Sequence, residues 1–148
     1  MTFVYILIFA ATVAFSIILA GGTIYGFIDY PSVVMVVASI LLFVLASGQW
    51  KEFSCGIKHL FEWQRPEQID SKTAVRISRL FRTLSFASLA IGGFWSIMGI
   101  ILMLCNLNPE TIGQGLAIVL LTLFYSFFLS VAVFFPISLY YAGKHGVG

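Results

Sequence analysis

Charged residues are scarce in this sequence. Only 9% of its 148 residues are Asp, Glu, Lys or Arg, whereas 60% are hydrophobic. Soluble globular domains carry roughly a quarter charged residues, so the composition excludes an ordinary water-soluble domain. Four long windows contain no charged residue at all: residues 1–28, 30–50, 83–109 and 111–143. Each window can hold the roughly 20 apolar residues that a helix needs to cross a bilayer.

The apolar windows also lack the alternation of polar and apolar residues that is typical of membrane β-barrels, as the unbroken run 33–45 shows. We therefore predict an all-α integral membrane protein, a single transmembrane domain over residues 1–148. Its four transmembrane helices are expected at about residues 2–22, 31–49, 83–106 and 112–142. No basic residue precedes the first apolar run, so we interpret that run as a membrane helix and not as a cleaved signal peptide.

Lys and Arg are missing from two of the three predicted loops. Seven of the eight lie within residues 50–82, and the eighth, Lys144, follows the fourth span. The positive-inside rule places the 50–82 loop and both termini in the cytoplasm. Apolar residues recur at helical spacing in 50–61, which predicts an amphipathic helix along the inner membrane interface. Pro66 should end it, and Asp70 or Ser71 should cap a new helix that runs from the cytoplasm into the third span.

Arg76, Arg79 and Arg82 follow one another three residues apart on that emerging helix, so they form one basic face. Contact with lipid headgroups would explain this face, and so would contact with a cytoplasmic partner.

Metal ligands and reactive groups are few. Cys55 is predicted inside and Cys105 near the outer surface, which excludes a disulfide or a shared metal site between them. His59 and His145 add no ligand cluster. We expect no metal, no cofactor, no nucleic-acid partner and no enzymatic activity, because no nucleophile with a base can be assembled from these residues.

Small residues form stripes along the third and fourth spans. Such stripes let helices approach closely in lipid, and hydroxyls along one face could instead line a path for water or a small cation. The stripe residues recur at spacings of three or four in the third span and are repeated in the fourth: Ser85, Ser88, Gly92, Ser96 and Gly99, then Gly115, Thr122, Ser126 and Ser130.

No Asp, Glu, His, Lys or Arg lies inside any predicted span. Proton relays and small multidrug-type transporters need an ionisable group there, so the chain alone does not fit either class. If it moves ions, a second protein must supply the carboxylate.

Three segments resemble the MotA/TolQ/ExbB proton-channel superfamily, and most closely its MotA-type flagellar stator branch. The first segment is similar to the family's GG…FIDxPS link between spans one and two. The other two resemble its third span, APAFGMIGTLIGLIQML, and its fourth, IGxxMAVALLTTLYG…FLP. The matching residues are Gly21, Gly22, Phe27, Ile28, Asp29, Pro31 and Ser32; Ala90, Gly92, Ser96, Gly99, Met103 and Leu104; and Ile112, Gly113, Gly115, Ala117, Leu120, Leu121, Thr122, Tyr125 and Pro136.

The resemblance implies a bacterial inner-membrane motor. In that family five copies surround two single-span partners of the MotB, ExbD or TolR type, whose membrane Asp takes and releases ions. It implies that Ser96, Thr122, Ser126 and Tyr125 line the ion path and that Pro136 shapes the fourth span. The stripe residues Ser88, Gly92, Gly99, Gly115 and Ser130 would then pack helices together.

The chain departs from the family pattern at three points. Leu89 replaces the Pro of the third span, and Leu123 replaces the second Thr of the TT pair, which favours protons over sodium. The large cytoplasmic domain that pushes on a rotor is reduced to residues 50–82. The alternative function is that of a structural or assembly subunit that does not conduct ions.

Overall fold

The chain is helical wherever its structure is described. The computed structural model describes residues 2–61, 70–105 and 112–144, and no strand occurs among them, which confirms the all-α prediction. Pro66, the outer loop at Glu110 and His145 lie outside the described residues. The elements are α1 (Thr2–Leu19), the 3₁₀ turn η1 (Ile24–Phe27), α2 (Tyr30–Ala46), α3 (Trp50–Phe61), α4 (Ser71–Cys105), α5 (Ile112–Phe128), the π-helical segment η2 (Leu129–Phe134) and α6 (Phe135–Lys144).

Two of these helices are long and apolar enough to cross a membrane. α4 has 35 residues, about 52 Å at the usual helical rise, and the expected continuous helix from residue 71 into the third apolar window is confirmed. α5, η2 and α6 form the second rod, which has 32 residues from Ile112 to Gly143 and is apolar overall. α1 and α2 are also apolar but shorter.

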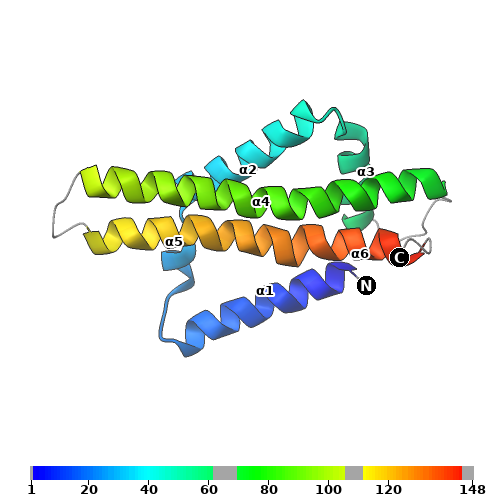
Figure 1. Ribbon diagram of the computed structural model, residues 1–148. Coiled ribbons are helices and arrows are strands. Elements are labelled where there is room, and N and C mark those ends of the chain that lie inside the picture. The colour runs from blue at the N-terminus through cyan, green and yellow to red at the C-terminus, as the bar shows by residue number, and fades with distance from the viewer. Residues whose placement is uncertain (1, 62–69, 106–111, 145–148) are drawn as a thin grey trace.

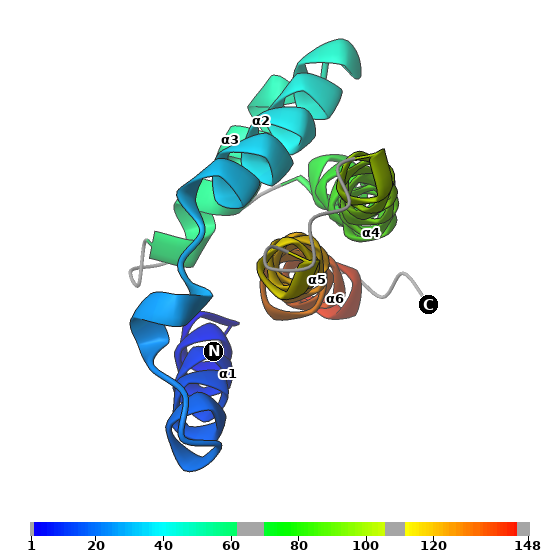
Figure 2. The ribbon, with the colours of Figure 1, turned by 90° about the vertical axis from the view of Figure 1, so that its left-hand side faces the viewer.

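The two long helices lie antiparallel and side by side, with α1 and α2 flanking them (Figure 1). Viewed along the long helices, α1 lies on the side of α5 and α6 that is away from α4, whereas α2 contacts both α4 and α5 (Figure 2). The N-terminus, α3 and the end of α6 all lie at the same end of the molecule.

Glycines end the first two helices earlier than expected. Gly21 has a φ of 75° and Gly48 a φ of 67°, a left-handed conformation that glycine adopts without the penalty of a side chain. The amide groups of Gly21 and Gly22 donate to the carbonyls of Ile18 and Ile17, which is the Schellman pattern of a helix C-terminus. The first predicted span, 2–22, therefore ends at Leu19, and the second, 31–49, ends at Ala46.

The fourth apolar window is one rod that widens before Pro136. The amide of Phe135 donates to the carbonyl of Ser130, five residues earlier. Proline has no amide hydrogen, and its ring clashes with the carbonyl four residues before it in an α-helix. A π-helical turn just ahead of Pro136 is one way in which a helix continues through such a residue.

The hydrophobic core lies at the end that carries α3. Phe81 of α4 is fully buried at its centre, stacked on Phe53 of α3 with ring centroids 5.9 Å apart. Gly56 packs directly on Phe81, since a Cβ at Gly56 would lie 2.2 Å from the Phe81 ring. The predicted amphipathic helix is therefore present, and part of its apolar face docks on the protein itself.

Candidate functional site

The small-residue stripes of α4 and α5 face each other within one chain. A Cβ at Gly92 would lie 2.2 Å from the Ser126 hydroxyl oxygen, and one at Gly99 would lie 2.7 Å from Val119. A Cβ at Gly115 would lie 3.2 Å from the sulfur of Met103. The two helices approach so closely because these positions lack side chains.

Serine hydroxyls connect the same two rods. The Ser130 hydroxyl donates to the Ser85 carbonyl at 3.0 Å, and the Ser96 hydroxyl donates to the Val119 carbonyl at 3.1 Å. A weaker bond of 3.4 Å joins the Ser88 hydroxyl to the Ser126 carbonyl. These donors are bonded to backbone oxygens across the contact, so burial leaves them satisfied.

A further serine pair was missed by sequence reasoning. The hydroxyls of Ser78 and Ser138 each donate to the other residue's carbonyl, both at 3.0 Å. Ser78 precedes Ser85 by two helical turns and thus continues the α4 stripe. The sequence signal for this pair is the spacing of seven residues between Ser78 and Ser85.

A second set of bonds ties α5 to the segment between α1 and α2. The Tyr125 hydroxyl accepts the Asp29 amide hydrogen at 2.9 Å and donates to the Phe27 carbonyl. The hydroxyls of Thr122 and Ser32 share a hydrogen bond of 2.9 Å. We call these five residues the linker site.

Asp29 also begins α2. Its carboxylate accepts the amide hydrogen of Ser32 at 3.2 Å, and Pro31 occupies the first turn, as is typical of a helix N-terminus. The residues that start α2 are thus the ones that α5 holds. Sequence reasoning singled out both sides of the linker site but gave no sign that they touch.

The residues predicted to line an ion path are largely enclosed by the chain. Ser96, Thr122 and Ser126 are 6%, 6% and 1% exposed, while Tyr125 is half-buried. α4 and α5 use their small-residue faces on each other within one chain. The outward surfaces of α4 and α5 instead carry large apolar side chains, among them Phe86, Phe94, Ile97, Leu116, Leu120 and Phe127.

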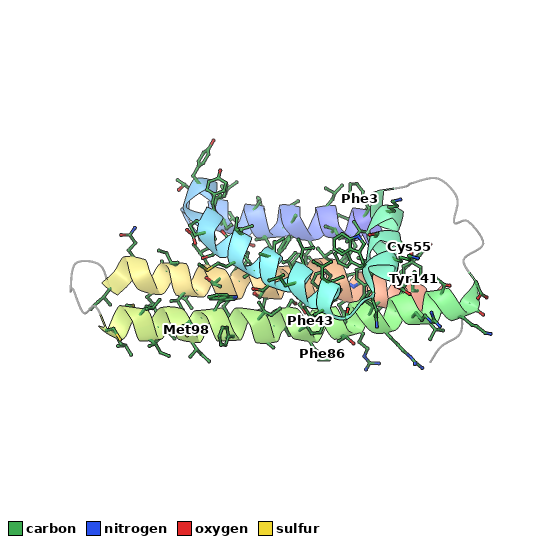
Figure 3. All side chains as sticks on the ribbon, turned by 90° about the horizontal axis from the view of Figure 1, so that it is seen from above. Phe3, Phe43, Cys55, Phe86, Met98 and Tyr141 are labelled. Atoms are coloured by element: carbon green, nitrogen blue, oxygen red, sulfur yellow. The ribbon has the colours of Figure 1, made fainter. Side chains whose placement is uncertain are left out.

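The remaining predicted site residues lie elsewhere. Arg76, Arg79 and Arg82 are exposed on α4. Cys55 lies in α3, beside the core that includes Tyr141 (Figure 3), whereas Cys105 ends α4 at the far end of the molecule. Within residues 2–61, 70–105 and 112–144 no three His, Cys, Asp or Glu side chains are grouped in a way that could hold a metal ion.

No protein-family model matches this chain, and no curated protein matches it. The part of the chain that the structure describes is all-helical and has two long apolar helices. Small residues and serine hydroxyls join these two helices, and the linker site connects α5 to α2.

Proposed function

We propose that the chain is a MotA-like subunit of an ion-driven, proton-conducting complex in the bacterial inner membrane. The observation that carries the proposal is the linker site, in which two of the three segments that resemble the MotA branch meet. Tyr125 and Thr122 of the fourth-span motif bond Asp29 and Ser32 of the FIDxPS motif. Residues about 90 positions apart in the sequence are expected to meet in this way if both motifs serve one structure.

The arrangement of the helices supports a four-span, multi-pass topology. α1, α2, α4 and the α5–α6 rod are all apolar, and their outward side chains are mostly large and apolar, as lipid requires. The N-terminus, α3 and the end of α6 share one end of the molecule (Figure 1), which fits cytoplasmic termini and a cytoplasmic 50–82 loop.

In this proposal the chain supplies a hydroxyl-lined scaffold and the partner supplies charge. Five copies would surround two single-span proteins, each with one Asp in its membrane segment. A hydroxyl near that carboxylate hydrogen-bonds it and shifts its proton affinity. Tyr125 is the predicted path residue that reaches the surface of a single chain, and Ser96, Thr122 and Ser126 lie behind it at the helix contact.

A second candidate function is that of a structural subunit. The observation that favours it is that the predicted path hydroxyls already bond acceptors inside the chain: Ser96 to Val119, Thr122 to Ile118 and Ser126 to Thr122. Helix packing alone would account for such bonds.

Proton uptake separates the two functions. Vesicles should hold the chain together with a single-span protein that has one Asp in its apolar segment. We expect uptake by the pair and none by the chain alone. Thr122→Val should lower the rate, since it removes the hydroxyl and a bond of about 1 kcal/mol while it keeps the volume, and Ser96→Ala should lower it less.

The matched control is Thr12→Val. Thr12 is exposed on α1 and donates only to the carbonyl of Ile8 in its own helix. Native mass spectrometry of each variant should show five copies, with or without two single-span chains. Normal assembly with parental uptake for both Thr122→Val and Ser96→Ala would favour the structural subunit, and only monomers in mild detergent would contradict the ring.

A further inference from the structure

One face of α4 is exposed along most of its length and is basic in its first part and apolar in its second. Apart from the adjacent pair Arg82 and Thr83, the exposed residues of this face recur three or four positions apart, so they lie on one side of the helix. They are Lys72, Arg76, Arg79, Arg82, Thr83, Phe86, Ala90, Phe94, Ile97 and Ile101.

The change falls between Arg82 and Phe86, which are one helical turn apart. Before it the charged members of the face are all basic, and after it the face is apolar. Phe86 is 66% exposed, Phe94 and Ile97 are each 60% exposed, and Phe86 points away from the neighbouring helices (Figure 3). A ligand that fits this face has an anionic head and a long apolar body.

The arginines have no carboxylate partner among the described residues. Asp70 is exposed at the start of α4, more than two turns before Arg79, and Glu52 belongs to α3. No ion pair joins either acid to these arginines in the part of the chain that the structure describes. No described residue neutralises their guanidinium groups, and the planar fork of guanidinium suits phosphate oxygens.

We propose that this face of α4 binds an anionic phospholipid, with the headgroup phosphate at Arg79 and Arg82 and the acyl chains along Phe86, Phe94 and Ile97. The proposal rests on the membrane placement proposed above. Charge complementarity favours a phosphate group at the arginines, and the apolar half of the same face begins one turn beyond Arg82, where the acyl chains of a bound lipid would lie. Basic residues beside a membrane-spanning helix attract anionic lipids in general, and this face adds a continuous apolar track for the tails.

The test is lipid retention by the purified full chain. The chain is reconstituted in vesicles of phosphatidylcholine with about one-third phosphatidylglycerol and extracted in mild detergent. Native mass spectrometry then identifies the lipids that stay bound to it. The parent should retain phosphatidylglycerol over phosphatidylcholine. Loss of each cation near the surface should lower that preference about fivefold, so Arg79→Gln with Arg82→Gln should lower it about 25-fold.

The matched control is Lys72→Gln, which removes one positive charge from the same face. Lys72 lies seven residues before Arg79, about 10 Å farther from the apolar half, so the change should be less than twofold. A loss of about fivefold in Lys72→Gln, the same as expected for each arginine, would overturn a local site. Retention of both lipids alike by the parent would also overturn it and would leave the arginines to a cytoplasmic protein.

Neither result depends on the proposed ion flow. The measurement uses the chain without a single-span partner, so it stands even if the pair takes up no protons. Resistance of the chain to alkaline extraction from membranes is measured beside it and tests the membrane placement separately.

Discussion

The Tyr125 hydroxyl fixes the backbone just before α2, because it accepts the amide hydrogen of Asp29, 96 positions earlier, at 2.9 Å. It also donates to the carbonyl of Phe27. One side chain of α5 thus satisfies two backbone groups of a segment that has little regular structure of its own. The contact thus joins α5 to the start of α2.

Tyr125→Phe should loosen that segment while it leaves the helices formed. The ring is kept, but the Asp29 amide and the Phe27 carbonyl lose their partner, at a cost of about 1 kcal/mol. Hydrogen exchange at the amides of residues 27–32 should become faster, and the melting temperature in detergent should fall. Tyr30→Phe is the matched control, because Tyr30 is 75% exposed in the same region. Equal exchange in the two variants would show that the linker site does not hold α2.

Gly92→Ala should destabilise the contact between α4 and α5. The added Cβ would lie 2.2 Å from the Ser126 hydroxyl oxygen and 2.3 Å from the Ser126 Cβ, so the helices must separate, at a cost of about 1–3 kcal/mol. Gly93→Ala meets nothing within 4 Å and should be neutral or slightly stabilising.

The double variant Gly92→Ala with Ser126→Gly should recover part of the loss, since it moves the small residue to the other helix. Thermal unfolding in detergent measures all of these variants. If Gly92→Ala and Gly93→Ala melted alike, the close approach of the two helices would be disproved.

Gly56→Ala should weaken the docking of α3. Its Cβ would lie 2.2 Å from the Phe81 ring, and Phe81 is fully buried, so the ring has little room to move. Cys55, half-buried next to this contact, should then react faster with a thiol reagent in detergent. Gly113→Ala, which meets nothing within 4 Å, should leave that rate unchanged. An unchanged rate in Gly56→Ala would place α3 outside the core.

The two cysteines test the proposed topology. Cys55 belongs to α3, at the end of the molecule with the termini, and Cys105 is exposed at the other end of α4. A membrane-impermeant thiol reagent applied to intact cells should leave Cys55 unlabelled in the Cys105→Ser variant. It should label Cys105 in the Cys55→Ser variant. Labelling of Cys55 before lysis would reverse the orientation.

The helices could be predicted because lipid and charge impose simple rules. Each of the four windows without charge contains an apolar helix, but only two of these helices are long enough to cross a membrane. The uninterrupted pattern after Asp70 predicted the continuous α4. α1 and α2 each end about three residues before the end of the predicted span. The reason is that Gly21 and Gly48 adopt a left-handed conformation, which hydrophobicity does not reveal.

The neighbours of the striped faces could not be predicted. Helical spacing shows which residues share a face, but it does not show what lies opposite, so Gly92 and Ser126 could equally have faced lipid, a partner or each other. The contact of Tyr125 with Asp29 was beyond reach for the same reason. The resemblance to the MotA branch includes both residues, but in separate segments, and it does not predict that they touch.

The reciprocal serine bonds determine how the long helices can move. Ser78 and Ser138 bond across the two rods in both directions, and the Ser130 hydroxyl donates to the Ser85 carbonyl, so sliding by a single residue would break all three bonds at once. Shear between the rods is thereby resisted, and rotation of the two together is not. We expect α4 and the α5–α6 rod to move as one rigid body. A displacement at the end near Cys105 would then also displace the arginines and α3.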